Sequence, residues 1–251
     1  MAMGSPLKAL MNLYPKWLLR REYQKQKFKR FNERPIEFAF LFRKLTELYP
    51  KTVIDVGTGT SALPTLIRKC GFVVTAVDNV RDYWPRGMFN KHYHVVDDDI
   101  TKSQITECYD MVVCISVLEH IEDSDAAVRH MFQLLNPGGH LLMSFPYTER
   151  SYVRNVYQLP GSSYGKGRPY ITQSYSRENV DRWLAKSNGM IQEQEFWQCW
   201  EGEHWTVGKQ VIPPRRVSAS DTHQLTCLHL SRQPSAISRL PLLEASKPDP
   251  V

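Results

Sequence analysis

Short apolar runs alternate with amphipathic patterns through the middle of the chain. Apolar residues three or four positions apart predict helices over 61–70, 123–135 and 176–189. Other runs are apolar on both faces, which is typical of buried parallel strands. These runs cover residues 52–56, 72–78, 92–96, 109–116 and 139–145. Strands that alternate with helices in this way predict parallel βαβ units.

The pattern changes after Phe145. Residues 146–175 contain six tyrosines, three glycines and three prolines without a regular period, so we expect an ordered insertion there. Strand patterns return at 190–198 and 223–231, and the residues between these two runs form a second long loop in this interpretation. Four prolines in residues 232–251 predict a flexible tail.

The positive charge of the chain is concentrated at its N-terminus. The net formal charge is +6, and residues 1–34 hold nine Lys or Arg and two Glu, a balance of +7. The remaining 217 residues are close to neutral, with 23 basic and 24 acidic side chains. Trp17, Tyr23 and Phe28 lie among the basic residues of segment 1–35, a pattern found in interfacial helices on anionic lipid. A solvated helix packed on the rest of the chain explains the pattern equally well.

Length and composition favour a single α/β domain over residues 36–231. A chain of 251 residues with 42% hydrophobic and 23% charged residues is ordinary for a soluble globular protein. No apolar run approaches the roughly 20 residues of a membrane span, and no secretory signal is visible. The five cysteines are scattered and form no C-x-x-C pair, which favours reduced thiols. We expect a cytoplasmic enzyme, with peripheral membrane contact as an option for the N-terminal segment.

Glycines after the first strand indicate a nucleotide-like ligand. Gly57, Gly59 and Ala62 fit the G-x-G-x-x-G/A spacing of a dinucleotide fingerprint. Asp78 lies where that fingerprint places a ribose-binding acid. Asp55 opposes a dinucleotide, because its carboxylate would stand close to the pyrophosphate and repel it. A carboxylate at that position suits S-adenosylmethionine, which has no phosphate but carries an ammonium group and a sulfonium.

The segment D-V-G-T-G at 55–59 resembles the first motif of the class I S-adenosylmethionine-dependent methyltransferases of the small-molecule type. VVDDDIT after the third strand and SVLEHI after the fourth resemble later motifs of this family. The resemblance is specific over residues 50–146 and only architectural afterwards. It implies an α/β, Rossmann-like, doubly wound and mostly parallel seven-stranded sheet with the last strand antiparallel, plus an N-terminal helical segment and two insertions. It assigns cofactor binding to Asp55, Gly57, Thr58, Gly59, Asp78, Asn79, Asp99, Ile100, Ser116 and Val117.

The resemblance also divides the cofactor among these residues. Asp78 would accept hydrogen bonds from both ribose hydroxyls. Asp99 and Ile100 would contact the amino group and the face of the adenine. The end of the fourth strand would face the methyl group, and His120 is the candidate catalytic base there, because imidazole titrates near neutral pH.

Side chains near the ends of the strands are the candidates for binding the acceptor. Binding groups of open α/β sheets gather above the carboxyl ends of the strands. On this ground we expect substrate contacts from Glu119, Tyr147, Tyr175 and His204. The His, Asp and Glu residues show no spacing that specifies a metal site, so no metal is predicted.

Three functions remain open at this point. The leading hypothesis is methylation of a small-molecule or lipid-linked acceptor, on a hydroxyl of a sugar or natural product. The second is an RNA methyltransferase that uses residues 1–34 as a phosphate-binding arm. The chain lacks N-P-P-Y or D-P-P-Y after the fourth strand, which disfavours methylation of nucleobase amino groups. The third is a protein that binds the cofactor without turnover. The acceptor and the oligomeric state are left open by the sequence.

Overall fold

The computed structural model describes residues 5–28, 33–84, 87–88 and 92–232. The chain falls into two compact units, the second of which starts at Glu33. The first unit contains helix α1 (Ser5–Gln24), and the second contains the sheet. The flexible tail expected at 232–251 lies outside the described residues, except for Arg232, the last residue of the final strand.

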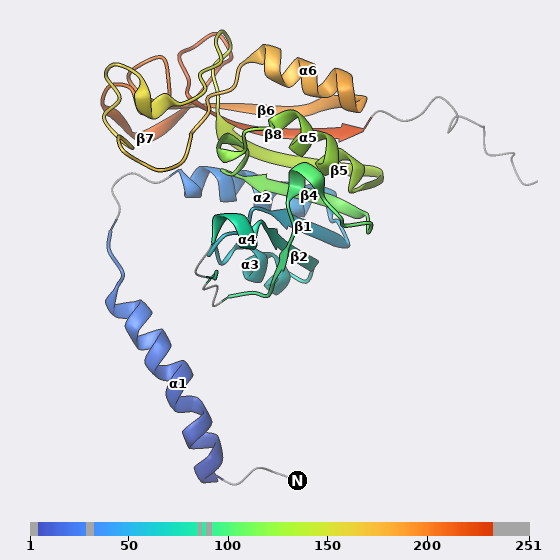
Figure 1. Cartoon of the computed structure of the whole chain (residues 1–251), viewed down its shortest axis with the longest axis vertical. Helices are drawn as coiled ribbons and strands as arrows, with labels where there is room; N and C mark the ends of the chain where they lie inside the picture. Colours follow the sequence, from blue (N-terminus) through green and yellow to red (C-terminus); the bar gives the residue numbers. More distant parts are fainter. Residues whose placement is uncertain (1–4, 29–32, 85–86, 89–91, 233–251) are drawn as a thin grey trace, which may run out of the picture. The chain divides into compact units, whose positions relative to one another are not determined.

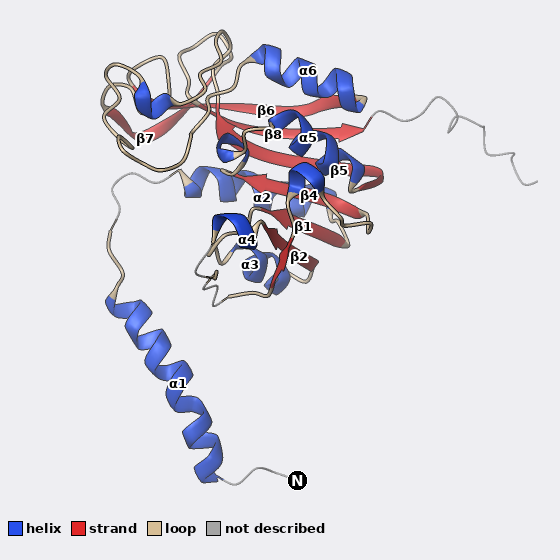
Figure 2. Ribbon diagram, in the orientation of Figure 1, coloured by secondary structure: helices blue, strands red, loops and turns tan. Residues whose placement is uncertain are grey.

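One eight-stranded sheet forms the second unit (Figure 1 and Figure 2). Its strands are β1 (Thr52–Val56), β2 (Val73–Asp78), β3 (Val95–Asp97), β4 (Tyr109–Ile115), β5 (Leu135–Pro146), β6 (Gly189–Trp200), β7 (Gln210–Val217) and β8 (Leu225–Arg232). They lie in the order β3-β2-β1-β4-β5-β8-β6-β7. β1 to β5 are mutually parallel, whereas β8 runs antiparallel to both β5 and β6. The predicted Rossmann-like α/β architecture is confirmed.

The sheet has eight strands rather than the seven that the sequence predicts. The additional strand is β7, which lies at one end of the sheet and pairs antiparallel with β6. Its sequence resembles a loop because Pro213 and Pro214 interrupt it. Proline has no backbone N–H to donate, but an edge strand tolerates it because one side of that strand has no partner strand.

The order of the strands places a crevice at the end of β1. The chain passes from β1 to β2 and β3 on one side, and β4 and β5 lie on the other side. In open α/β sheets such a reversal leaves a crevice at the carboxyl ends of the two central strands, where ligands bind. The residues that follow β1, β2 and β4 therefore meet at one place.

Local signals explain where the main helices begin. Ser176 caps α6 (Arg177–Ser187) through a capping box with Asn179. Asp123 caps α5 (Ser124–Gln133), and Pro35 lies in the first turn of α2 (Arg34–Leu48). The remaining helical elements are α3 (Leu63–Lys69), α4 (Val80–Tyr83), η1 (Ile100–Lys102), η2 (Leu118–His120) and η3 (Val156–Gln158).

The two insertions contact each other. Ser162, in the first insertion, forms a bridge with Val207 in the second. The hydroxyl oxygens of Ser162 and Thr206 lie 2.8 Å apart. Figure 1 shows these loops, in yellow and orange, together at the end of the sheet that carries β7. The insertions therefore form one ordered layer rather than two independent loops.

Candidate active site

A cavity of about 700 Å³ opens at the carboxyl ends of β1, β2 and β4. This volume lies in the range of small-molecule and cofactor sites. The cavity brings together residues predicted from four separate segments of the sequence. The predicted residues that line it are Gly57, Gly59, Asp78, Asn79, Asp99, Ile100, Ser116, Val117 and His120.

The turn after β1 lines the cavity with backbone atoms, because two of its residues are glycines without side chains. Gly57 and Gly59 have φ values of +75° and +54°, a left-handed conformation that glycine adopts without cost. A Cβ on Gly57 would lie 2.3 Å from Cγ1 of Val117, so no larger residue fits there. The amides of Gly57 and Thr58 donate to the carbonyl of Val77 at 2.8 and 3.1 Å. These bonds hold the turn against β2.

Asp78 closes β2 and faces the cavity. Its Oδ2 accepts a hydrogen bond from the amide of Gly59 at 2.8 Å, and its Oδ1 accepts one from Nε1 of Trp84 at 3.2 Å. Burial raises the pKa of Asp78, and these two donors oppose the shift. Each carboxylate oxygen has a second lone pair. Both oxygens can therefore still accept a hydroxyl hydrogen of a ribose.

The residues after β3 form another part of the lining. Oδ1 of Asp99 caps η1 by accepting from the amide and the hydroxyl of Thr101, at 2.9 and 2.8 Å. Ile100 is buried and lines the cavity beside it. Asp97 does not line the cavity, and its Oδ1 accepts from the amide of Val80 at 2.9 Å. A fixed carboxylate beside an apolar side chain suits the edge and the face of an adenine.

Two buried carboxyl groups lie next to the lining residues. Asp55 and Glu119 are 2% and 5% exposed. Among the described residues, Oδ2 of Asp55 and Oε2 of Glu119 have no hydrogen-bond partner. Burial raises the pKa of Asp55 to about 7 and that of Glu119 to about 8. A cationic ammonium group bound beside them would favour their ionised forms and supply the missing donors. The methionine end of S-adenosylmethionine carries such a group.

An ion pair between the buried Glu37 and the partly exposed Arg34, both on α2, supports the end of β4. Glu37 accepts hydrogen bonds from the hydroxyls of Ser116 and Ser144. Its Oε2 lies 2.9 Å from Nη1 of Arg34, which also donates to the carbonyl of Ile115. Burial raises the pKa of Glu37, and the charge of Arg34 opposes the shift. Ser116 has a φ of +50°, a conformation that costs a non-glycine residue about 1 kcal/mol. Its hydrogen bond to Glu37 helps to hold it there.

His120 reaches the cavity from η2. Its Nδ1 lies 2.7 Å from the carbonyl oxygen of Ile171. A carbonyl only accepts, so in the neutral imidazole Nδ1 carries the proton and Nε2 has a free lone pair. Nε2 lies 3.9 Å from Oε1 of Glu119, and the ring of Tyr170 packs edge-on at 5.0 Å. Burial lowers the pKa of His120, so the ring is neutral at pH 7.

Residues 171–175 of the first insertion, named the clamp here, hold η2 in place. The hydroxyl of Tyr175 donates to the carbonyl of Leu118 at 2.7 Å. The side-chain amide of Gln173 donates to the carbonyl of Ile121, also at 2.7 Å. The carbonyl of Ile171 accepts from His120. The clamp therefore contacts Leu118 and His120, the two ends of η2, and Ile121 directly after it. The insertion therefore determines the orientation of the imidazole.

None of the four predicted substrate residues lines the cavity, although Glu119 directly precedes the lining residue His120. Tyr147 and Tyr175 are fully buried and form a parallel bridge in the core. The hydroxyl of Tyr147 donates to Glu149 at 2.9 Å. The prediction that these two tyrosines bind substrate is corrected, since both are used in packing. His204 lies in the second insertion and does not line the cavity.

Several lining residues were not singled out from the sequence. Tyr83, Trp84 and Tyr170 place aromatic rings in the cavity wall, although no periodic pattern marks them. Arg34 counted only toward the basic N-terminal segment, yet its guanidinium pairs with Glu37 inside the second unit. Helix spacing places Arg34 and Glu37 on one face, but it could not reveal that Glu37 is buried, because the serines bonded to Glu37 lie 79 and 107 residues away.

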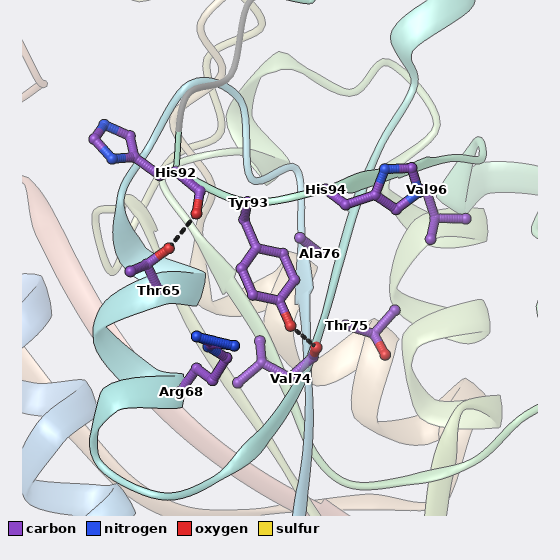
Figure 3. A pocket seen from close by; sticks show the side chains of 9 residues that line it. All are labelled: Thr65, Arg68, Val74, Thr75, Ala76, His92, Tyr93, His94 and Val96. Atoms are coloured by element: carbon purple, nitrogen blue, oxygen red, sulfur yellow. Dashed lines mark hydrogen bonds between the residues drawn. The ribbon is translucent and has the colours of Figure 1, made fainter. Parts of the chain in front are cut away.

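A second hollow, of about 510 Å³, lies along α3 and β2 (Figure 3). The ring of Tyr93 lies across it, and its hydroxyl donates to the carbonyl of Val74 at 2.5 Å. The hydroxyl of Thr65 donates to the carbonyl of His92 at 2.5 Å. None of the predicted site residues lines this hollow. It is therefore a weaker candidate than the cavity at the end of β1.

The side chains of the larger cavity distinguish between a dinucleotide and S-adenosylmethionine as the cofactor. No Lys or Arg is among the described residues that line it. Carboxylates without neighbouring cations repel a pyrophosphate, whereas they can bind the hydroxyls of a ribose and an ammonium group. A Rossmann-like fold with carboxylates after β1, β2 and β3 defines an enzyme that binds S-adenosylmethionine.

The chain belongs to the class I S-adenosylmethionine-dependent methyltransferases. The family described as "Methyltransferase domain" matches residues 22–193, which is more than half of the chain. S-adenosylmethionine is therefore the cofactor of this enzyme, and the reaction is the transfer of its methyl group. Among the described residues, no cluster of three or more His, Cys, Asp or Glu is arranged to hold a metal ion.

The similar curated proteins include ubiquinone biosynthesis O-methyltransferases. The protein of Coxiella burnetii is 26% identical over 168 residues, which cover 62% of this chain and 70% of the relative. The protein of Vibrio vulnificus is 30% identical over 119 residues, which cover 44% of this chain and 50% of the relative.

Solved structures with the same fold include magnesium protoporphyrin IX methyltransferase from Synechocystis with bound S-adenosylhomocysteine. The TM-score is 0.51 at 14% identity, over 91% of this chain and 99% of that one. TehB from Haemophilus influenzae gives a TM-score of 0.50 at 15% identity, over 78% of this chain and 62% of that one. At these identities the likeness concerns the fold.

Proposed function

We propose that this enzyme methylates a ring hydroxyl of a small or lipid-linked molecule, with His120 as the general base. The observation that carries the proposal is the free lone pair of Nε2 on a histidine that lines the cofactor cavity. A hydroxyl acceptor must lose a proton as it is methylated, whereas a neutral amine needs little help. A neutral imidazole in a fixed tautomer is suited to accept the proton that a hydroxyl loses during methylation.

Each residue of the site has a defined task in this proposal. When bound, S-adenosylmethionine supplies the methyl group on its sulfonium. Asp78 and Asp99 hold the nucleoside, and Asp55 favours the ammonium group. Nε2 of His120 accepts the proton of the acceptor hydroxyl. Nδ1 keeps its bond to the carbonyl of Ile171, which stabilises the imidazolium that forms.

Two observations support a ring-containing acceptor. Tyr170 lines the cavity beside His120 and remains 39% exposed, so part of its ring is available for stacking. The similar curated proteins are named as O-methyltransferases of ubiquinone biosynthesis. A phenolic hydroxyl, free or on a lipid-linked ring, agrees with both observations, and a sugar hydroxyl is the alternative.

The experiment that tests the proposal is transfer of labelled methyl to matched phenols and anilines by wild-type enzyme and His120→Gln. We expect His120→Gln to lower kcat for a phenol by about 10²–10⁴-fold, because the base is lost. The affinity for S-adenosylhomocysteine should stay within about twofold, because the cofactor contacts remain. The wild-type rate should fall on acidification with a midpoint below 6.5, because burial lowers the pKa of His120 and protonation removes the lone pair.

His130→Gln is the matched control. Nδ1 of His130 also faces a backbone carbonyl, that of Ala126 at 3.0 Å, but His130 does not line the cavity. This variant should keep the wild-type kcat. Near-normal turnover of phenols by His120→Gln would show that His120 is not the base. Methylation of anilines but not phenols would show that the acceptor atom is nitrogen.

A further inference from the structure

Helix α1 (Ser5–Gln24) carries an apolar stripe that nothing in its own unit covers. Leu10, Leu13, Tyr14 and Trp17 follow one another at intervals of three, one and three residues. At 3.6 residues per turn this spacing places them on one face. Each of the four side chains is more than half exposed. These four residues are named the α1 stripe here.

Basic residues lie at the C-terminal end of the α1 stripe and beyond it. Between residues 10 and 28 the chain has five cationic side chains and one anionic side chain, Glu22. The cationic residues are Lys16, Arg20, Arg21, Lys25 and Lys27. The rings of Tyr14 and Trp17 stack at 6.2 Å, and the guanidinium of Arg21 lies 5.4 Å from the centroid of the Trp17 ring. An aromatic pair is thus combined with a cation on the same face.

We propose that α1 lies flat on an anionic lipid surface, with the α1 stripe in the boundary between headgroups and acyl chains. Leu side chains gain from leaving water, and Trp and Tyr rings favour the interface. Long Lys and Arg side chains can extend from the edges of such a helix to lipid phosphates. No helix among the described residues is long and apolar enough to cross a membrane. The proposed contact is therefore with one leaflet.

The residues of α1 favour lipid over RNA and over a second copy of the chain as the partner of the α1 stripe. RNA would use stacking rings and cations, but Leu10 and Leu13 offer a base nothing to stack on. A second copy of the chain would need an apolar repeat sustained over several heptads. Here the stripe covers only residues 10–17, and Pro15 interrupts the hydrogen bonding of the helix within it. A charged bilayer requires neither a stacking surface nor a long repeat.

The test is sedimentation of the full chain with phosphatidylcholine vesicles, with and without 30% phosphatidylglycerol. Leu10→Ser is the test variant and Leu19→Ser is its matched control. The two leucines are 64% and 63% exposed. They lie nine residues apart, about two and a half turns, so they point to opposite faces. Both substitutions make the same chemical change in the same helix.

We expect the wild type to bind the anionic vesicles at least about tenfold more tightly than the neutral ones. Leu10→Ser should weaken that binding by about tenfold, the cost of one buried leucine, and Leu19→Ser should leave it unchanged. Added salt should also weaken it. Titration with S-adenosylhomocysteine reports that the second unit of each variant is folded, and equal far-UV circular dichroism of the two variants reports that α1 is retained.

Other results would overturn the proposal. Equal loss of binding in the two leucine variants would show that the stripe is not the binding face, and equal binding to both kinds of vesicle would show that charge plays no part. Tighter binding to a mixed-sequence RNA than to vesicles would identify a phosphate-binding arm. A dimer that dissociates in Leu10→Ser, measured by light scattering, would identify a second copy as the occupant. None of these results bears on the acceptor hydroxyl or on His120.

Discussion

Asp55 is a carboxyl group with very little access to water, next to a cavity that binds a cation. Its pKa of about 7 means that it is about half protonated at neutral pH in the free protein. The nearby charge of Asp78 contributes to that raised value. The ammonium group of a bound ligand acts in the opposite direction and lowers the pKa.

Binding of S-adenosylhomocysteine at pH 7 should therefore release about half a proton from Asp55. Calorimetric titration of wild type and Asp55→Asn in buffers of different ionisation enthalpy measures this number as the difference between the two proteins, because Glu119 can also release a proton. Asp55→Asn should reduce the release and weaken binding, and Asp97→Asn should change neither, because Asp97 does not line the cavity. A heat of binding that is the same in every buffer would show that Asp55 is already ionised in the free protein.

The residues that line the cavity could be predicted from the sequence because each lies at the end of a strand that local patterns mark. Gly57, Asp78 and Ile100 needed only that information. Tyr147 and Tyr175 could not be assigned in the same way. Their burial depends on a contact between residues 28 positions apart, and the chemistry of tyrosine suits both packing and binding.

At the scale of elements, the clamp links the first insertion to η2. Gln173 is buried, donates to the carbonyl of Ile121 and accepts from the hydroxyl of Tyr152, both at 2.7 Å. Gln173→Met keeps the length of the side chain but leaves that carbonyl unpaired. We expect kcat to fall by about tenfold because His120 is less well oriented, while affinity for S-adenosylhomocysteine changes little.

Gln224→Met provides the control for this substitution. Gln224 is also a buried amide, and it accepts from the amides of Cys199 and Trp200 at 2.9 Å, away from η2. Both variants should lose about 1–3 kcal/mol of stability in urea denaturation, the cost of unpaired buried groups. Only Gln173→Met should lower kcat per folded molecule. Equal kcat values would assign the clamp a purely structural role.

Asp125 joins α5 to α6. It accepts from Arg182, from Nε1 of Trp183 at 2.8 Å and from Nζ of Lys186 at 2.7 Å. Burial alone would raise the pKa of Asp125, but these donors lower it to about 2. A lowered pKa adds stability above the pKa of the unfolded chain, about 3.9, and that stability is lost as the pH falls from about 4 to about 2.

Asp125→Asn should therefore cost about 1–2 kcal/mol at pH 7, since the carboxylate is partly open to solvent. The difference from wild type in the free energy of unfolding should shrink as the pH falls from about 4 to about 2. Urea denaturation at each pH measures it, with Asp181→Asn on the exposed side of α6 as the control. A difference that stays constant with pH would rule out a role for the charge.

The burial of each strand explains whether the sequence could predict it. β1, β4 and the second half of β5 were predicted because burial on both faces gives a continuous apolar run. β2 was predicted from its apolar run although Val73 is exposed. β7 was not, since an exposed edge strand with two prolines has neither an apolar run nor alternation. Its pairing with β6 depends on the neighbouring strand rather than on its own residues.

For the whole molecule, the cofactor cavity couples binding to stability. S-adenosylhomocysteine at about 100 times its Kd should stabilise the fold by about 2.7 kcal/mol. In a domain of this size that corresponds to a rise in Tm of about 5–10 °C. Asp78→Ala should remove most of this shift because Asp78 faces the cavity, and Asp97→Ala should retain it. A full shift in Asp78→Ala would place the ribose elsewhere.

The first insertion has a consequence for how such an enzyme can diverge. Tyr170 lines the cavity, and the next residue, Ile171, provides the carbonyl that lies 2.7 Å from Nδ1 of His120. In the proposed function, exchange of the whole insertion during evolution would alter acceptor choice and disable the base in a single event. Replacement of the Tyr170 side chain leaves the adjacent carbonyl in position. New acceptor preferences should therefore arise in lineages of this chain through stepwise substitution at Tyr170 before any loop is replaced.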